Sequence, residues 1–408
     1  MRFLIPFALF ILVDFYLYQA VLKSTKSLSK KKQNWIKWIY WAIPVVFSVL
    51  IGIAYVSESR SLFYPILPFI LLYLSKLLGV VILSMEDLSR GLRWIALKIK
   101  TLFSPPKKEL PGTKISRSTF ISQTALAATA VHTGAFGWGI LSGAHDYTIH
   151  RTTLALKNLP SAFDGMVIGQ LSDIHSGSFY KKTAVQGGVD MLLEQKPDLV
   201  FFTGDLVNNE AKELNEYFDI FKQVQAPLGV YSIMGNHDYG DYHRWENQAA
   251  KEKNLEMLKK GHQTLGWNLL LDEHRSLKVG NESIGIIGIQ NWGEGGFAKY
   301  GDLDKALKNT DDFPVKLLLS HDPSHWRAQV LGKTNIDAAF AGHTHGMQYG
   351  VELGDFKFSP AQLRYKEWAG LYTENEQHLY VNRGFGYLGY PGRVGILPEI
   401  TLIELKKA

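Results

Sequence analysis

Residues 229–238 read Gly-Val-Tyr-Ser-Ile-Met-Gly-Asn-His-Asp, and this stretch decides how the second half of the chain folds. Its first six residues are apolar enough to predict a buried strand, and the glycine that follows lets the backbone turn sharply. Asn236, His237 and Asp238 then bring together an amide, an imidazole and a carboxylate. At the carboxyl end of a central strand, these side chains would project into the crevice where open α/β sheets hold their sites. One such stretch is equally typical of a turn that ends a strand.

Four other predicted strands end in the same kinds of side chain. Asp173 and His175 lie two positions apart after one strand, and residues at that spacing in an extended segment point to the same side. His343 and His345 have the same spacing after another strand. Polar residues that repeatedly end apolar strands are hard to explain by packing, so the pattern predicts one site built by five loops. The side chains of ligand type at these five strand ends are Asp173, His175, Asp205, Asn236, His237, Asp238, His321, Asp322, His343 and His345.

Residues 146–408 alternate between apolar strands and amphipathic helices, which predicts an α/β domain. No internal repeat or low-complexity tract interrupts this part of the chain. We expect helices at 181–195, 210–224 and 244–265. The expected strands are 166–171, 198–203, 229–234, 283–290, 315–320, 336–341, 379–382 and 400–405.

Residues 1–145 have the composition of a membrane region with about four transmembrane helices. The fourth apolar stretch is rich in Ala, Gly and Thr, and is also compatible with a soluble helix. Basic residues outnumber acidic ones after the first and third stretches, and the positive-inside rule places such connections, including a linker at 85–118, in the cytoplasm. Residues from 146 onward would then face the periplasm or the cell exterior. The expected spans are 3–22, 38–56, 62–83 and 120–141.

Two charged residues, Asp14 and Lys76, lie inside predicted spans, where charge is costly. We expect them to pair between the first and third helices, the alternative being that each faces a wet cavity or the lipid headgroups. Residues 90–103 alternate between basic and apolar side chains in a roughly helical period. This pattern predicts a helix that could lie along the membrane surface.

The chain has 408 residues and no cysteine, which excludes disulfides and thiolate metal sites. Any metal must therefore be held by His, Asp, Glu, Asn or water. The formal net charge of +6 could indicate nucleic-acid binding, but the basic residues cluster between apolar segments and not on one soluble face. We therefore expect the membrane as a partner and no nucleic acid.

Taken in chain order, the five motifs resemble those of the calcineurin-like metallophosphoesterase superfamily, from about residue 163 to the end of the sequence. The nearer resemblance is to its bacterial membrane-anchored branch, in which transmembrane helices precede the phosphoesterase domain. The resemblance implies N-terminal transmembrane α-helices followed by an α/β domain, a two-sheet β-sandwich flanked by helices. It also implies a centre with two divalent metal ions, for which nitrogen and oxygen ligands suit Mn, Fe or Zn.

Carried over onto this sequence, the family's motifs imply a ligand set and a catalytic histidine. His237 would contact the scissile phosphate or the leaving oxygen, and Asp238 would orient its imidazole. Arg383 or Arg393 could meet a second phosphate or a headgroup, although each is equally typical of a surface arginine in a glycine-rich loop. One metal would take Asp173, His175 and His345, the other would take Asn236, His321 and His343, and Asp205 would bridge them.

These features predict a phosphoesterase anchored in the bacterial inner membrane that hydrolyses a phosphodiester or phosphomonoester. The anchor favours an envelope or lipid-linked substrate. The alternatives are a pyrophosphate hydrolase resembling the UDP-diacylglucosamine hydrolases of lipid A synthesis, a non-catalytic metal-bearing sensor or scaffold, and a transporter or channel. Aromatic residues that could line the pocket rim or serve in packing are Tyr180, Tyr239, Tyr242, Trp292 and Tyr387.

Overall fold

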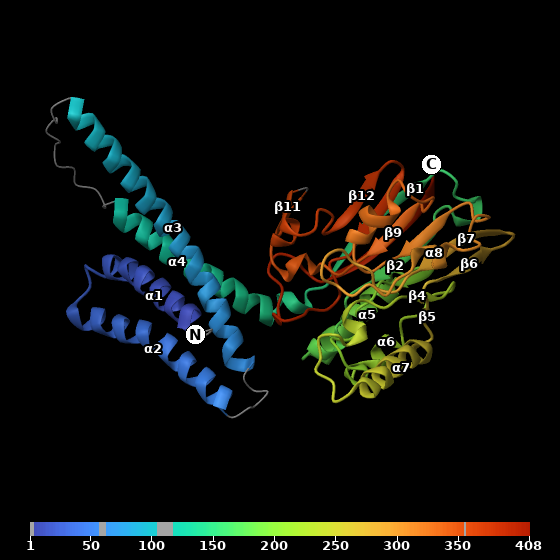
Figure 1. Cartoon of the computed structure of the whole chain (residues 1–408), viewed down its shortest axis with the longest axis horizontal. Coiled ribbons are helices and arrows are strands. Elements are labelled where there is room, and N and C mark those ends of the chain that lie inside the picture. The colour runs from blue at the N-terminus through green and yellow to red at the C-terminus, as the bar shows by residue number, and fades with distance from the viewer. Residues whose placement is uncertain (1–3, 57–62, 104–116, 355) are drawn as a thin grey trace. The chain divides into compact units, whose positions relative to one another are not determined.

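The computed structural model describes residues 4–56, 63–103, 117–354 and 356–408 (Figure 1). The chain divides into two compact units, Met1–Gly137 and Trp138–Ala408. This division lies close to the boundary that the change in composition predicts, between the apolar first third and the α/β alternation that begins at residue 146.

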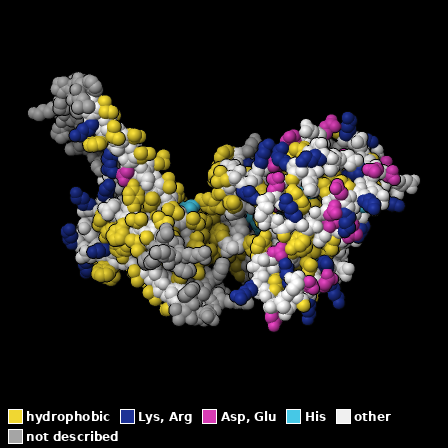
Figure 2. Space-filling model, viewed as in Figure 1, with side chains coloured by type: hydrophobic (Ala, Val, Ile, Leu, Met, Phe, Trp, Pro, Cys, Tyr) yellow, Lys and Arg dark blue, Asp and Glu magenta, His cyan; other side chains and the backbone are white. Residues whose placement is uncertain are grey.

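Among the described residues, the first unit is helical, and its last helix continues into the second unit. The helices are α1 (Leu4–Ser24), α2 (Lys30–Val56), α3 (Phe63–Phe103) and α4 (Arg117–Leu141). Two helical stretches in the described part of the chain are long and apolar enough to cross a membrane, Lys30–Ile53 and Ile66–Lys100. Figure 2 shows the hydrophobic side chains that gather over this unit.

Apart from a few residues outside the described ranges, the four predicted spans fall on these four helices. The spans at 38–56 and 62–83 correspond to the two stretches with enough length and apolar character. The spans at 3–22 and 120–141 correspond to α1 and α4, and membrane crossing by these two helices stays a prediction.

The first half of the predicted linker is helical. Residues 85–103 extend α3 without interruption to a total of 41 residues, which is about 62 Å at the rise of an α-helix. A hydrocarbon core of about 30 Å accommodates only half of this length. Residues 104–116 of the predicted linker lie outside the described residues.

Asp14 and Lys76 form the predicted pair. The Lys76 Nζ atom lies 2.5 Å from Asp14 Oδ1, and both side chains are buried between α1 and α3. Tyr73 donates a hydrogen bond to the other carboxylate oxygen, and the Tyr40 hydroxyl donates to the Asp14 backbone oxygen at 2.9 Å. The Lys76 ammonium also lies over the rings of Tyr40 and Tyr73. The charges are therefore compensated inside the first unit.

The second unit contains two mixed six-stranded sheets and a separate hairpin, β10 (Val351–Leu353) with β11 (Phe356–Phe358). One sheet has the order β1-β14-β2-β3-β4-β5, and the other has the order β12-β13-β9-β8-β7-β6. The strands of the first are β1 (Thr148–Leu156), β14 (Glu399–Lys407), β2 (Val167–Leu171), β3 (Leu199–Phe202), β4 (Val230–Ser232) and β5 (Asn268–Leu269). Those of the second are β12 (Gly370–Glu374), β13 (Gln377–Val381), β9 (Ala338–Ala341), β8 (Lys316–Leu319), β7 (Glu282–Gly288) and β6 (Glu273–Val279).

The two sheets pack face to face, as the predicted sandwich requires. Phe201 on β3 meets Phe340 on β9 with ring centroids 5.0 Å apart, in a core that both sheets supply. Phe202, the next residue, points to the opposite face and packs with Trp267. Helices cover the outer faces, with α5 (Lys182–Glu194), α6 (Phe218–Phe221) and α7 (Gln248–Leu265) on the first sheet and α8 (Leu303–Leu307) on the second.

Several elements differ from the predictions: one predicted helix is broken, and helix α8 and the strands β1, β5, β6, β10, β11 and β12 were not predicted. The predicted helix at 210–224 is broken into a 3-10 turn, Ala211–Leu214, and the short α6, because the Glu213 side chain turns back to accept hydrogen bonds from the backbone of residues 208–210. The strand β1 was not predicted. Its early residues are only partly buried, so it lacks an apolar run, and it pairs in parallel with β14 along its whole length.

Candidate metal centre

The seven predicted ligands come together at the carboxyl ends of five strands. Strands β2, β3 and β4 run parallel in one sheet, and β8 and β9 run parallel in the other. Because parallel strands end at the same edge, the loops that follow them converge. Asp173 and His175 follow β2, Asp205 follows β3, Asn236 follows β4, His321 follows β8, and His343 and His345 follow β9.

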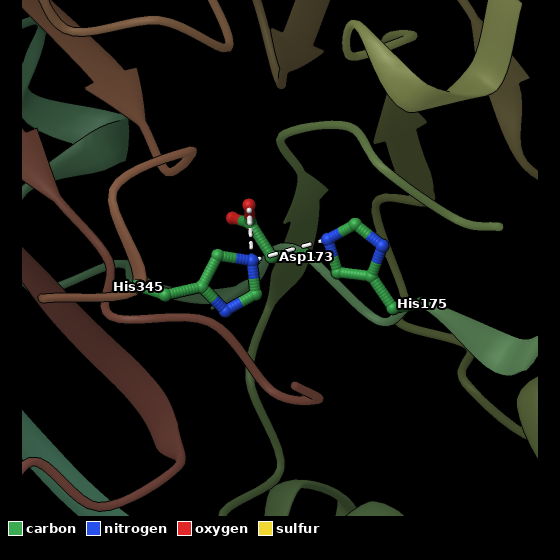
Figure 3. A group of neighbouring side chains, drawn as sticks. All are labelled: Asp173, His175 and His345. Atoms are coloured by element: carbon green, nitrogen blue, oxygen red, sulfur yellow. Dashed lines mark hydrogen bonds and ion pairs between the residues drawn. The ribbon is translucent and has the colours of Figure 1, made fainter. Parts of the chain in front are cut away.

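Asp173, His175 and His345 form the first group of potential metal ligands (Figure 3). The Nε2 atoms of the two histidines lie 3.1 Å apart, and His345 Nε2 lies 3.2 Å from Asp173 Oδ1. The three side chains point toward one another from two loops, the one after β2 and the one after β9. This is the set that the sequence assigns to the first metal.

Asp205, His321 and His343 form the second group, with Asn236 beside it. The His343 Nδ1 atom lies 2.9 Å from Asn236 Oδ1 and 3.3 Å from His321 Nε2. The Asp205 Oδ2 atom lies 3.1 Å from His321 Nε2 and 3.5 Å from His175 Nε2, so its carboxylate reaches both groups. The bridging position predicted for Asp205 agrees with this geometry.

The backbone at the site is strained. Five of the seven residues have φ angles between 50° and 70°, in the left-handed region that non-glycine residues rarely adopt. Each such residue costs on the order of 1 kcal/mol, so the surrounding fold must hold it in place. Residues of this kind cluster at functional sites. They are Asp173, His175, Asp205, His343 and His345.

Two glycines allow the loops to approach one another. Gly204 has a φ of +97°, and a Cβ atom there would lie 2.6 Å from the backbone nitrogen of Gly235. A Cβ atom on Gly235 would in turn collide with the Asp205 carboxylate. The glycines that precede Asp205 and Asn236 are therefore needed for close backbone contact.

Hydrogen bonds on the outer side of the rings orient the histidines. The His321 Nδ1 atom lies 2.7 Å from the backbone oxygen of Thr203, and His175 Nδ1 lies 3.1 Å from Asn208 Oδ1. Each of these contacts places a proton on Nδ1 and directs the Nε2 atom at the centre. His343 is reversed, because its Nε2 atom lies 2.8 Å from the Tyr365 hydroxyl and its Nδ1 atom faces Asn236.

Backbone amides and burial set the charge of the site. The His343 N–H donates to the Asp173 carboxylate and the His237 N–H donates to Asp205, both at 2.9 Å. Burial favours the neutral form of both carboxyl groups, but the facing histidines outweigh it and lower their pKa values. Both carboxylates are therefore ionised at neutral pH, as metal ligands must be.

The histidines respond in opposite directions. Burial lowers the pKa of His175 to about 3. Burial also acts to lower the pKa of His321, but the Asp205 carboxylate outweighs it and raises that pKa to about 10. The Asp205 carboxylate thus faces the neutral imidazole of His175 on one side and the protonated imidazole of His321 on the other.

The side chains of His237 and Asp238, which the sequence predicts to be partners, do not bond to each other. The His237 Nδ1 atom lies 2.9 Å from the backbone oxygen of Asn208, which orients the ring. Asp238 is fully buried, and its carboxylate accepts hydrogen bonds from the N–H groups of Gly235, Asp205, Leu206 and Val207 at 2.8 to 3.2 Å. Asp238 therefore fixes the loop that carries Asp205, and the predicted contact with the His237 imidazole is corrected.

Both arginines proposed for substrate contact are buried. Arg383 is 3% exposed and forms ion pairs with Glu399 at 2.5 Å and Glu352 at 2.7 Å. Arg393 is 1% exposed and donates to the backbone oxygens of Arg383 and Gly384. Since both guanidinium groups are buried and bonded inside the fold, the structure supports a packing role. Arg393 lies behind the ligand His345, with Nη2 3.3 Å from its Nδ1.

Three aromatic side chains lie against the centre, and only one was predicted. Tyr242 stacks against His237 with centroids 4.6 Å apart and accepts a hydrogen bond from Asn236. Tyr365 and Phe297 contact His343 and had no sequence motif that pointed to them. The other predicted rim residues have different partners: Tyr239 stacks on Tyr300, Trp292 packs with His325, and Tyr180 and Tyr387 lie against His145.

Two family models match the chain. The model described as the transmembrane domain of a probable calcineurin-like phosphoesterase matches residues 1–144. The model described as calcineurin-like phosphoesterase matches residues 166–347, a range that contains all seven predicted ligands. The chain belongs to the calcineurin-like metallophosphoesterases. It is a phosphoric ester hydrolase associated with a membrane through its N-terminal transmembrane domain.

Similar metallophosphoesterases occur in several organisms. The chain is 29% identical to the metallophosphoesterase YkuE of Bacillus subtilis, over 72% of this chain and 98% of that protein. It is 28% identical to the phosphodiesterase YaeI of Escherichia coli, over 71% of this chain and 99% of that protein. It is also 28% identical to a transmembrane protein with metallophosphoesterase domain from Danio rerio, over 72% of this chain and 63% of that protein.

The donor set of this metallophosphoesterase fits divalent cations. The facing nitrogen atoms of His175 and His345 are 3.1 Å apart, and two lone pairs at this distance repel unless a proton or a cation lies between them. Ionised carboxylates complete both groups, and the chain supplies no sulfur ligand. Nitrogen and oxygen donors of this kind suit Mn, Fe or Zn, and they do not select among these metals.

Proposed function

We propose that this metallophosphoesterase hydrolyses a phosphodiester or phosphomonoester of a lipid-linked or envelope substrate. The observation that supports the chemistry is the convergence of seven nitrogen and oxygen donors from five strand ends, with strained backbone at five of them. The transmembrane domain supports the substrate class, because it confines the catalytic unit to molecules near a bilayer.

In this proposal the two ligand groups hold two divalent cations. Asp173, His175 and His345 hold one, His321, His343 and Asn236 hold the other, and Asp205 contributes to both. When bound, such a pair of cations neutralises phosphate oxygens and lowers the pKa of a coordinated water.

The chain's own residues keep these donors in place. The Nδ1 contacts of His175 and His321 direct their Nε2 atoms inward. The Asp238 carboxylate holds the backbone around Asp205, so the shared carboxylate cannot turn away.

His237 is the proposed proton donor. Its Nδ1 atom donates to the Asn208 backbone oxygen, which leaves Nε2 as the atom that can take up or release a proton. A protonated Nε2 can stabilise the leaving oxygen of the phosphoester. Tyr242 packs against the ring and limits its rotation.

The proposed location is the bacterial inner membrane, with the catalytic unit in the periplasm or outside the cell. The basic connections at 23–37 and 85–118 support this orientation. A topology reporter fused behind the catalytic unit should be active only outside the cytoplasm. A cytoplasmic signal would contradict the orientation and favour a substrate on the inner face of the membrane.

The chemistry is tested with the full-length chain purified in detergent. It should hydrolyse bis-p-nitrophenyl phosphate when Mn²⁺ is supplied, and a chelator should abolish the reaction. Asp205→Asn should reduce the rate by at least about 10²-fold, because the shared charge is lost. Asp337→Asn is the matched control: Asp337 precedes β9, at the other end of the strand from His343, and caps the Lys316 amide. Equal activity of both variants would contradict the proposal.

A further inference from the structure

Helix α3 extends beyond the length that a bilayer needs. Its apolar part, residues 66–83, would span about 27 Å, close to the thickness of a hydrocarbon core. Residues 84–100 then carry Glu86, Asp87 and four basic side chains, a composition that is too costly for the membrane interior. This second part of α3 is therefore expected to stand in water.

Apolar side chains nevertheless continue along this part of α3, and they are exposed. Met85, Leu88, Leu92, Ile95 and Ile99 follow one another at spacings of three and four residues, and their side chains are 49 to 67% exposed. We refer to these five residues as the α3 seam. Figure 2 shows hydrophobic side chains along this helix beside basic ones.

The spacing of the α3 seam is a heptad repeat. Met85, Leu92 and Ile99 occupy position a, and Leu88 and Ile95 occupy position d, the two positions through which helices pair in a coiled coil. The repeat continues toward the N-terminus through Leu78 and Val81, which are also exposed. In the described part of the chain, every residue from 91 to 100 is exposed, so no described segment covers the later half of the seam.

We propose that the α3 seam pairs with the same seam of a second copy of this chain, forming a parallel two-stranded coiled coil next to the membrane. Copies inserted in one membrane have the same orientation, so their α3 helices are parallel and equal positions meet. The a and d positions from 85 to 99 are all apolar and therefore complement themselves.

Charge does not oppose this self-pairing. Arg90, Arg93 and Lys100 lie at positions f and b, on the outer side of the helix. Lys98 is the charged residue at a flanking g position in residues 84–100. The basic side chains of the two copies are thus kept apart.

An alternative occupant is the membrane surface, with the basic side chains on anionic headgroups. That arrangement requires the helix to turn after the spanning part. The structure instead shows α3 as one unbroken helix through Gly91, and its direction is kept (Figure 1). The proposal does not depend on the substrate, because it concerns the first unit alone.

The absence of cysteine from the sequence permits a clean crosslinking test on the full chain in native membranes. Leu92→Cys places a thiol on the seam at position a. Leu97→Cys is the matched control, since Leu97 lies at position f of the same helix and is equally exposed, at 61% against 59% for Leu92. Mild oxidation should give at least about tenfold more disulfide-linked dimer for Leu92→Cys, as expected if pairing favours the seam by one power of ten.

A second pair of variants keeps the test decisive. In a Leu88→Cys background, Ile95→Glu should abolish the dimer by burying two like charges in the seam, whereas Leu97→Glu should leave it unchanged. Equal crosslinking at 92 and 97 would overturn the proposal. Absence of dimer for both Leu92→Cys and Leu97→Cys would also overturn the proposal. If the membrane then shields each thiol from a water-soluble reagent, the segment lies on the membrane surface.

Discussion

The two units of this metallophosphoesterase both bury charged side chains, but they treat the charge in opposite ways. In the first unit, the Asp14 carboxylate is matched by the Lys76 ammonium and by the hydroxyls of Tyr40 and Tyr73. In the second unit, Asp173 and Asp205 face histidine nitrogens that also face one another. The Asp14 charge is compensated within the chain, whereas the second cluster brings nitrogen atoms of two histidines to 3.1 Å from each other beside two carboxylates.

The difference separates a structural cluster from a ligand site. The residues of the Asp14 cluster lie on regular helices, and none of them has a positive φ angle. The metal centre holds five residues in left-handed backbone conformations, which the surrounding fold must stabilise. Replacements at the two clusters should therefore have different consequences: at the centre they should affect activity and metal content, and at the Asp14 cluster they should affect stability.

The largest effect is expected from His345→Gln. Loss of this donor should remove metal from the Asp173–His175 group and lower kcat by about 10²- to 10³-fold. Metal analysis of the purified chain, together with the rate on bis-p-nitrophenyl phosphate, measures both. His378→Gln on β13, whose Nδ1 contacts Thr373, is the control. Full metal content and full activity in His345→Gln would show that His345 is not a metal ligand.

The next effect concerns stability. Lys76→Met leaves the Asp14 carboxylate buried without its cation and should destabilise the chain by about 3 kcal/mol. The double variant Asp14→Leu with Lys76→Met removes both charges and should recover most of that loss, since apolar replacement of a buried pair is often neutral. Denaturant unfolding in detergent measures both variants. If the double variant is no better than the single one, the pair is not the reason for the loss.

A smaller effect is expected at Tyr365, which orients His343 through its Nε2 atom. Tyr365→Phe should weaken metal binding or activity by about 10- to 100-fold, the usual range for a residue that positions a metal ligand. Titration with Mn²⁺ after chelation separates weaker metal binding from slower catalysis. Tyr300→Phe, which removes a hydroxyl bonded to Asp241 instead, should change neither.

The smallest effect is expected at a buried histidine outside the metal centre, and it tests whether burial and an unpaired ring nitrogen are enough to indicate a metal ligand. His262 on α7 is fully buried, contacts Ser232 through Nδ1, and has no hydrogen-bond partner for Nε2 among the described residues. Burial lowers its pKa from 6.5 to about 3. The unfolded chain therefore binds a proton that the folded chain rejects, and stability falls as the pH drops below 6.5, by at most about 1.4 kcal/mol per pH unit.

His262→Gln should make this fall shallower without changing the metal content. The measurement is the free energy of unfolding as a function of pH for both chains. An unchanged slope would show that the folded protein tolerates a charged His262, and a loss of metal would mean that His262 belongs to the centre.

The ligands of the metal centre could be predicted because each follows an apolar strand in the sequence. Parallel strands align their carboxyl ends, so strand order brings Asp173 and Asp205 to one edge of the first sheet, and His321 and His343 to one edge of the second. Tyr365 could not be found in this way, because it lies in a loop with no motif and reaches His343 only through the folded chain. The same holds for Asn208, whose backbone and side-chain oxygens orient two histidines.

Adjacency in sequence was a poor guide to side-chain partners. His237 and Asp238 are neighbours, but they lie in a 3-10 turn that sends their side chains to different loops. For Arg383 the sequence left open a contact with phosphate or headgroup and a surface position in a glycine-rich stretch, and neither is its environment. Its actual partner, Glu399, comes from a strand 16 residues later, and nothing in the local pattern shows that contact.

The position of β14 has a consequence for how the protein matures. This strand lies between β1 and β2, although it follows every proposed ligand in the chain. Until it has been synthesised, β2 keeps an open edge and β1 has no neighbour in the sheet. The loop after β2 carries Asp173 and His175, so a nascent chain that stops before residue 399 has its ligands but not the sheet that aligns them. Metal should therefore be acquired only after β14 has joined the sheet, and chains truncated before residue 399 should aggregate through the exposed edge.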